Sequence, residues 1–368
     1  MLINKKILFL CYFANLKGDI TEQLLNTKNY SPLASVRLQI LPALQASISL
    51  GCDPRVFSIQ TDHCINEAVA ENPELCILGP IFPTPKNQDY IFRNHIKAIT
   101  QMKKNNSKIA AIYADNHVGT KSKIDHFYQA ALKKCNYVVT PTSCLKKIIS
   151  ESDLNLNTVH HILDPWQIPE EIAFAKKESE YKKILWFGSA SNLVYLDRVL
   201  KQFKKDDWLD SRKIELTIYT RKFAIQKYLE HIKSNPDDYP GWKFRFSHWN
   251  DNQQPIEFRN KLREAEIVLV PSDPEDPRKS GASHNRLVDA IRSGCIVIAS
   301  PLQSYCEFSD LETIGNDFCK ILKTCIENPQ YFHKKAESVR NQQLARFSPE
   351  LNLENWKKAI QIALNDAA

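Results

Sequence analysis

Long apolar runs are missing from the sequence: no stretch approaches the ~20 consecutive apolar residues that a membrane-spanning helix needs. The ten cysteines form no CxxC pair, and none lies in a His/Cys cluster with zinc spacing, which excludes the common structural zinc motifs. No block of consecutive basic residues occurs, and Lys and Arg (49) exceed Asp and Glu (42) by only 7. This scattered excess argues against a nucleic-acid partner and suits a small anionic ligand or an anionic membrane surface.

What the chain does contain is typical of a soluble globular protein. Its 368 residues exceed what one core usually organises, so we expect two domains. Several cysteines lie inside apolar runs, which indicates reduced, buried thiols and a cytoplasmic protein, with a peripheral contact at the inner face of the membrane left open. The run Ile7–Ala14 after Lys5-Lys6 could be a short signal peptide, but no small-x-small cleavage site follows it, and we interpret it as an opening β-strand.

Short apolar runs alternate with longer amphipathic segments in both halves of the chain. The predicted strands of the first half are Ile7–Phe13, Arg55–Ile59, Leu75–Leu78, Lys108–Tyr113, Tyr137–Thr140 and Thr158–Leu163. Asp164–Lys177 contains two prolines and is interpreted as a linker, after which the predicted strands are Lys183–Phe187, Ile214–Tyr219, Trp242–Ser247, Ile267–Val270 and Cys295–Ala299. Leu33–Leu50 is predicted to be a helix that kinks or breaks at Pro42.

Strands that alternate with helices in this way predict βαβ units and mostly parallel sheets. The fold class is therefore α/β, with two Rossmann-like domains whose parallel sheets face a cleft. We place the first domain at 1–165 and the second at 166–349. Ligands of open α/β sheets bind outside the carboxyl ends of the strands, so the residues that follow each strand are the candidate site residues.

In the first domain two loops after strands are candidates. The polar loop that begins at Ala14 is predicted to contact an acceptor through Asn15 and Gly18, with Arg37 on the next helix holding an anionic group. Asp115 and His117 follow the strand Lys108–Tyr113, where either could act as a base or orient a sugar hydroxyl. The alternative is a solvated loop, a surface arginine and an ordinary helix cap.

In the second domain the strand ends are basic and rich in small residues. Ser189 lies in Gly188–Asn192, where small residues would let a phosphate approach free N–H groups at a helix start. Arg221 and Lys222 follow the next strand and would add positive charge, and Trp249 follows a third and could flank a nucleobase. Each of these residues could also be ordinary surface or packing.

The most informative stretch is Pro271–Ser300, in which a strand, a polar loop, a helix and a second strand follow one another. Lys279, Ser280 and Ser283 together with the helix start are predicted to hold a diphosphate. On the helix Leu287, Ala290 and Ile291 mark the packed face. The polar face would carry Asn285, Asp289 and Arg292, with Asp289 placed to accept from ribose hydroxyls.

These pieces resemble the GT-B glycosyltransferases, and more specifically the family 4-like retaining enzymes. The resemblance rests on Pro271-Ser272, on Asp289–Gly294 and on Ile296–Ser300, and more coarsely on nearly the whole chain. It implies that Asp289 contacts the donor ribose, that the loop 278–286, including Asn285 and Arg286, holds donor phosphates, and that the last helix, 350–368, packs back on the first domain. The sequence departs from the family's two-glutamate motif, because the second acid is Asp289 and the position of the first is Gly281.

The resulting prediction is an enzyme that transfers a sugar from a nucleotide-sugar donor to a glycan or lipid-linked acceptor in polysaccharide biosynthesis. By the same resemblance we expect no metal and no cofactor besides the nucleotide-sugar co-substrate, because basic groups and helix starts would neutralise the leaving diphosphate. Two alternatives stay open: a non-hydrolysing nucleotide-sugar epimerase, and a non-catalytic protein of the same fold that binds a nucleotide or glycan.

Overall fold

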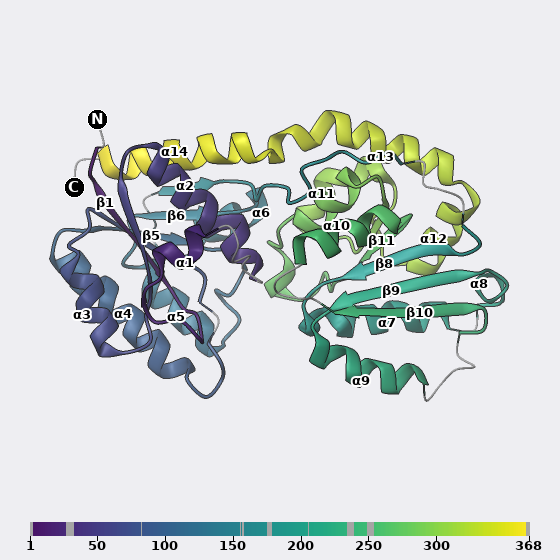
Figure 1. The fold of residues 1–368 in the computed structure, drawn as a ribbon, viewed down its shortest axis with the longest axis horizontal. Coiled ribbons are helices and arrows are strands. Elements are labelled where there is room, and N and C mark those ends of the chain that lie inside the picture. Colours follow the sequence, from purple (N-terminus) through teal and green to yellow (C-terminus); the bar gives the residue numbers. More distant parts are fainter. Residues whose placement is uncertain are drawn as a thin grey trace. The chain divides into compact units, whose positions relative to one another are not determined.

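The computed structural model describes residues 3–26, 33–81, 83–154, 156, 158–174, 179–204, 206–233, 239–248 and 254–365. It divides into two compact units (Figure 1). The first comprises Met1–Pro165, Pro277–Ser283 and Arg346–Ala368, and the second comprises Trp166–Asp276 and His284–Ala345. The predicted second domain had included Pro277–Ser283 and 346–349, which the structure assigns to the first unit because their contacts lie there.

The first unit is built on a seven-stranded sheet with the order β2-β3-β1-β4-β5-β6-β7. All neighbours pair in parallel except β2, which is antiparallel to β3. The strands are β1 (Lys6–Cys11), β2 (Gly18–Asp19), β3 (Asp53–Ser58), β4 (Leu75–Leu78), β5 (Lys108–Ile112), β6 (Tyr137–Thr140) and β7 (Thr158–His161). The six predicted strands are present. The structure adds β2, which at two residues is too short to show a periodic pattern in the sequence.

Alternate residues of β1 supply the two cores of this unit, as expected for a strand buried on both faces. Leu8 and Leu10 pack in one core with residues of α3, α4, α5 and α6. Ile7 and Phe9 pack in the other with residues of α2 and α14, and α14 lies beside α2 in Figure 1. The helices are α1 (Thr21–Leu25), α2 (Leu41–Ser49), α3 (Asp62–Ala70), α4 (Gln88–Lys104), α5 (Lys123–Leu132), α6 (Ser143–Ser150) and α14 (Pro349–Asn365).

The segment around Pro42 is helical and changes its helix type just before Pro42, where the prediction placed a kink or break. Val36–Ile40 forms a π-helix, η1, and α2 starts at Leu41 with Pro42 in its first turn. Proline has no N–H to donate to a carbonyl one turn back, so a widened turn precedes it. Pro42 is the second residue of α2, within the first turn, where a missing N–H is tolerated.

The second unit is built on a five-stranded parallel sheet with the order β10-β9-β8-β11-β12. Its strands are β8 (Lys182–Phe187), β9 (Ile214–Thr220), β10 (Trp242–His248), β11 (Ile267–Val270) and β12 (Ile296–Ala299). The chain runs outward from β8 to β10 and then returns to the other side of β8, so the strand order reverses between β8 and β11. That reversal is the switch point of a Rossmann-like sheet, where ligands of open α/β folds bind.

Helices cover both faces of this second sheet by packing on its strands. Trp186 of β8 packs with Leu196 of α7 and Phe318 of α12 in one buried cluster. The helices are α7 (Leu193–Phe203), α8 (Asp207–Asp210), α9 (Lys222–Lys233), α10 (Gln254–Glu264), α11 (Asn285–Arg292), α12 (Phe318–Glu327) and α13 (Pro329–Gln343). Shorter helical turns are η2 (Ala190–Asn192), η4 (Pro277–Lys279, in the first unit), η5 (Gln303–Leu311) and η6 (Leu344–Phe347).

The sequence predicted that the chain has no membrane-spanning helix and that its cysteines are reduced. Over the described part of the chain, every helix is too short or too polar to cross a membrane. All ten cysteines are described, and none of them forms a disulfide. Burial raises the pKa of the Cys11 thiol to about 12, as expected for a small hydrophobe in a core.

A buried histidine in the first unit predicts a loss of stability in mild acid. His95 of α4 is fully buried, with Nδ1 2.8 Å from the Ile91 oxygen and Nε2 3.1 Å from the Cys11 oxygen. Burial lowers the pKa of His95 from its ordinary 6.5, so the unfolded chain binds more protons than the folded one at pH values below 6.5. The free energy of unfolding should then fall with acidification through that range, by up to about 1.4 kcal/mol per pH unit.

Urea unfolding between pH 7.5 and pH 5.5 tests this prediction. His95→Gln should reduce the pH slope, whereas His126→Gln, which alters an exposed histidine of α5, should leave the slope as in the parent protein. Equal slopes in all three proteins would contradict the assignment to His95.

Candidate functional site

The loop after β5 is fixed by one buried hydroxyl group. The Tyr113 Oη atom accepts hydrogen bonds from the backbone N–H of His117 (2.6 Å) and of Val118 (2.8 Å), and it donates to Asn116 Oδ1 (3.4 Å). Burial is the main cause that raises the pKa of Tyr113 to about 12, so the hydroxyl stays protonated. The loop that carries the predicted residues Asp115 and His117 is therefore held in one conformation.

His117 lies against aromatic rings with its two ring nitrogens shielded from solvent. Its imidazole stacks on Tyr128, with ring centroids 5.2 Å apart, and meets Tyr113 edge-on. Among the described residues neither ring nitrogen has a hydrogen-bond partner. Burial lowers the pKa of His117, and the charges of Arg278 and Lys279 act in the same direction, against Asp115 and Asp125. The imidazole is thus neutral near pH 7 and able to accept a proton.

The segment Pro277–Ser283, which follows β11 by several residues in sequence, lies beside this loop in the first unit. Asn116 Nδ2 donates to the Pro277 oxygen (3.0 Å) and to Ser280 Oγ (3.3 Å). Thr142 Oγ1 donates to the Gly281 oxygen (3.2 Å). The cationic residues of this segment are thereby positioned by the carboxyl ends of β5 and β6.

The residues that the sequence grouped around one diphosphate are divided between the two units. Lys279, Ser280 and Ser283 belong to the first unit, whereas Asn285, Arg286 and Asp289 belong to the second. Asn116, which is 6% exposed, was not among the predicted site residues. Its bonds reach 161 and 164 residues along the chain, and no local pattern could have indicated them.

Gly281 allows a close approach that a larger residue would prevent. A Cβ atom at position 281 would lie 2.8 Å from Leu145 Cβ and 2.9 Å from Leu145 Cδ1. Since carbon atoms in van der Waals contact are about 3.5–4.0 Å apart, Gly281→Ala should displace the segment or cost about 1–3 kcal/mol of stability.

A double-mutant cycle checks this contact. Leu145→Ala alone should be destabilising, because Leu145 is fully buried. Gly281→Ala combined with Leu145→Ala should cost less than the sum of the two single changes when unfolding is measured in urea. Strict additivity would show that the Cγ and Cδ1 atoms of Leu145, which the change to alanine removes, do not oppose a methyl group at position 281.

The predicted acceptor residues lie near the amino-terminal strands of the first unit. Asn15 is exposed, in a loop that the Gln60 side chain fixes by donating to the Leu16 oxygen (2.6 Å). Gly18 begins β2 with a φ of +73°, a value that glycine adopts without strain. Arg37 is half-buried in η1. No observation tests their contact with an acceptor, which stays a prediction.

In the second unit, Gly188 directly follows β8 at the switch point and lies near an arginine. Thr220 Oγ1 donates to the Gly188 oxygen (2.7 Å), which fixes the start of the loop that carries Ser189. A Cβ atom at position 188 would lie 3.8 Å from Arg286 Nη1. That nitrogen is shielded from solvent and has no hydrogen-bond partner among the residues that the structure describes.

A shielded guanidinium nitrogen without a partner is unusual, because an unsatisfied donor on a charged group costs free energy. Arg286 lies in the first turn of α11, where backbone N–H groups also favour an anion. Arg286 Nη1 is therefore a cationic donor, in the first turn of α11, that the described part of the chain leaves unused.

Asp289 lies on the same helix, and its carboxylate accepts hydrogen bonds from Gln167. Its Oδ1 accepts from the Gln167 N–H (2.7 Å) and its Oδ2 accepts from Gln167 Nε2 (2.9 Å). Arg292 donates to the oxygens of Ile168 (2.6 Å) and Pro169 (2.7 Å). The predicted polar face of α11 is buried at both residues, which are 1% and 8% exposed, because the segment after Pro165 covers it. The ribose contact of Asp289 stays a prediction.

The remaining predicted residues have less structural context. Arg221 and Lys222 are exposed where β9 ends and α9 begins, and Trp249 lies outside the described residues. Within the described ranges, no group of three or more His, Cys, Asp or Glu side chains could hold a metal ion.

Comparison with known proteins identifies the fold. No family model matches the sequence, and no curated protein does. Solved structures match over almost the whole chain. Anabaena Alr3699/HepE in complex with UDP has a TM-score of 0.60 at 12% identity and covers 97% of this chain and 99% of its own. The chain has the GT-B fold.

Two further structures agree with this assignment. An α-glucosyltransferase in complex with UDP and a 13-mer DNA has a TM-score of 0.62 at 10% identity, covering 98% of this chain and 99% of its own. The lipopolysaccharide outer core galactosyltransferase WaaB, in its apo form, has a TM-score of 0.58 at 11% identity, covering 97% and 99%. At such low identity these matches establish the α/β fold with two parallel-sheet domains.

Proposed function

We propose that the protein is a glycosyltransferase that moves a sugar from a nucleotide-sugar donor to a glycan or lipid-linked acceptor, in polysaccharide biosynthesis. The GT-B neighbours support the reaction class, since two of them are glycosyltransferases by name and two are complexes with UDP. One neighbour is also bound to DNA, but the mild charge excess of this chain gives no reason to propose a nucleic-acid acceptor.

The observation that carries the proposal is the unpartnered Arg286 Nη1 beside Gly188 at the switch point of the second sheet. A guanidinium forms strong, charge-assisted hydrogen bonds to phosphate, and glycine at position 188 places no side chain beside that nitrogen. The donor diphosphate would lie there, with Ser189 in the same loop. Arg286 would then stabilise the charge that develops on the leaving diphosphate, so the proposed reaction needs neither a metal nor a cofactor.

The first unit supplies the proposed acid–base chemistry. A neutral His117 has the chemistry of a general base, and accepting the proton of an acceptor hydroxyl group requires a movement that exposes one of its shielded ring nitrogens. Asp115 in the same loop can orient that hydroxyl group. Burial, and to a smaller extent the charges of Arg278 and Lys279, lowers the pKa of His117, which keeps the imidazole neutral near pH 7. Asn116 and Tyr113 hold these groups in place without taking part in the chemistry.

Gly281 gives a physical reason for the missing acid of the family 4-like motif. Because a Cβ atom at that position would already overlap Leu145, no carboxylate side chain fits there. The contact that the first glutamate of the motif makes would therefore be absent from this protein. Arg278 and Lys279 precede Gly281 by three and two residues.

A nucleotide panel followed by a transfer assay tests the function. One of UDP, GDP, ADP, TDP and CMP should raise the apparent melting temperature, with about 2.7 kcal/mol of stabilisation at a hundredfold excess over its dissociation constant. The matching nucleotide sugar should then release nucleotide in the presence of acceptor. Sugar interconversion without acceptor would instead indicate an epimerase, and saturable binding without turnover a non-catalytic protein. The absence of any shift would contradict the glycosyltransferase and the epimerase and would leave only a non-catalytic protein that binds a glycan.

A further inference from the structure

A hollow of about 570 Å³ lies in the first unit between the carboxyl-terminal turns of α3 and α4. It is lined by Asn66, Val69, Ala70, Asn72, Gln101, Lys104 and Asn105. The strands that follow these two helices, β4 and β5, begin at Leu75 and Lys108. The hollow is therefore at the amino ends of the strands, whereas Asp115 and His117 follow the carboxyl end of β5. It is separate from the candidate site.

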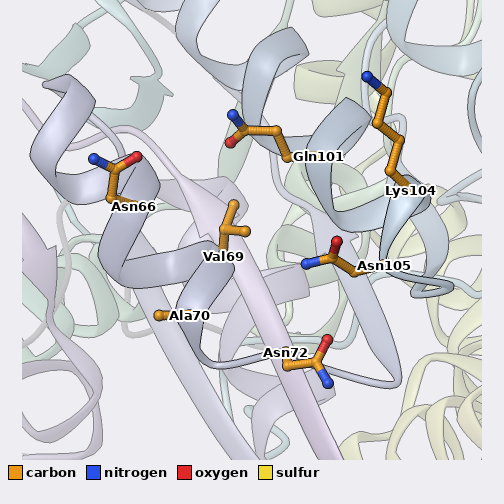
Figure 2. A pocket seen from close by; sticks show the side chains of 7 residues that line it. All are labelled: Asn66, Val69, Ala70, Asn72, Gln101, Lys104 and Asn105. Atoms are coloured by element: carbon orange, nitrogen blue, oxygen red, sulfur yellow. The ribbon is translucent and has the colours of Figure 1, made fainter.

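Helical spacing brings the lining residues to one side of each helix. Asn66 precedes Val69 and Ala70 by three and four positions on α3, and Gln101 precedes Lys104 and Asn105 by the same steps on α4 and its cap. Residues at these spacings share a helix face. Figure 2 shows the side chains of the two helices on opposite sides of the hollow, with the amide groups of Gln101 and Asn105 directed toward α3.

The polar groups of this lining are not used by the fold. No hydrogen bond or ion pair joins the side chains of the four carboxamide residues, or that of Lys104, to any other described part of the chain. Each carboxamide offers two donors and one acceptor at its tip, so the hollow presents several unused donor–acceptor pairs. Val69 and Ala70 add a small apolar surface between them.

The charged and polar groups around the hollow favour a neutral ligand over a metal cation or an anion. The lining contains no carboxylate, which removes the usual ligands of Ca²⁺ and Mg²⁺. The carboxyl ends of two helices converge here, and their partial negative charge disfavours a phosphate or another anion. Lys104 in the last turn of α4 offsets this dipole and leaves the site nearly neutral. The ligand class that fits is neutral, rich in hydroxyl groups and partly apolar.

We propose that this hollow is a secondary binding site for neutral saccharide units. Carboxamides bind vicinal hydroxyl groups by donating to one and accepting from the other, while the C–H face of a sugar ring packs on Val69 and Ala70. The lining has no aromatic ring, so binding to a single unit is weak, on the order of a millimolar dissociation constant. Such a site works by tethering an extended glycan, which raises its effective concentration near the protein.

The inference rests on the proposed function only for this tethering role, and saccharide binding itself is tested without any enzymatic assay. Isotope-labelled protein is titrated with maltotetraose, cellotetraose or chitotetraose, and the side-chain amide resonances of Asn66, Asn72, Gln101 and Asn105 are followed. We expect at least one tetrasaccharide to shift them together in a saturable way. No shift with any of the three would overturn the proposal.

Matched variants separate this site from the candidate donor site. Asn66→Ala combined with Gln101→Ala should weaken tetrasaccharide binding about tenfold, with nucleotide binding unchanged. Gln45→Ala, which removes an exposed carboxamide of α2 outside the hollow, should change neither. Equal weakening by Gln45→Ala, or wild-type binding by the double variant, would overturn the proposal. If nucleotide binding is absent while the tetrasaccharide still binds, the proposed function fails and the saccharide site stands.

Discussion

Arg286→Gln is expected to weaken the binding of the nucleotide diphosphate by about ten- to a hundredfold, because a hydrogen bond to a charged group contributes about 1.5–3 kcal/mol. The folded protein should lose little stability, since Arg286 Nη1 has no partner among the described residues that the change would remove. Isothermal titration with the nucleotide identified in the panel measures the first effect, and urea unfolding measures the second.

Two further variants make this prediction specific. Gly188→Ala adds a Cβ atom at ordinary contact distances, 3.4 Å from the nearest Trp186 atom and 3.8 Å from Arg286 Nη1. It should therefore fold normally while occupying the space in front of the guanidinium, and it should weaken the same nucleotide. Lys201→Gln on α7 removes an exposed positive charge from the same unit and serves as the control for net charge. Wild-type affinity in Arg286→Gln, or equal loss in Lys201→Gln, would refute the placement of the phosphate.

The architecture could be predicted from the sequence because each strand and helix has a hydrophobic pattern that is visible in its own residues. A strand buried on both faces must be apolar throughout, as in Leu75–Leu78 and Ile267–Val270, and the intervening helices show their own period. The predictions were weaker where a segment is short or its geometry is non-standard. β2 has two residues, and the π-helix at Val36–Ile40 has no sequence signature of its own. α3 was missed, although Thr61 caps it and is a residue type typical of that position.

The candidate site was less predictable because its parts are joined over long sequence distances. The residue types in Asp115–His117 and Ser283–Asp289 indicated polar chemistry, and both stretches follow predicted strands. The hydrogen bonds that organise them come from Asn116 to Pro277 and from Gln167 to Asp289. These partners are 161 and 122 residues apart. A pattern read along the chain indicates which residues are polar but not which of them the fold uses for its own support.

Asp289 allows a test of whether a polar residue supports the fold or contacts the ligand. Asp289→Ala is expected to destabilise the second unit by about 2–4 kcal/mol. The change removes the two oxygen atoms that accept from the Gln167 N–H and Nε2 and opens a cavity beside them, and each of these effects is costly in a buried environment. Asp289→Asn should cost less, because its amide oxygen can still accept from the Gln167 N–H. Urea unfolding of the two variants measures the difference.

Nucleotide affinity then decides what Asp289 does for the reaction. If its main role is to hold the segment after Pro165 on α11, Asp289→Asn will bind the nucleotide nearly as tightly as the parent protein, and Gln167→Ala will reproduce part of the stability loss. The energies of Asp289→Ala and Gln167→Ala should then be coupled by at least about 0.5 kcal/mol in a double-mutant cycle. If Asp289 instead accepts from the ribose, affinity will fall in Asp289→Asn while Gln167→Ala leaves it unchanged. The exposure of only 1% at Asp289 favours the first result, since both carboxylate oxygens already accept hydrogen bonds from Gln167.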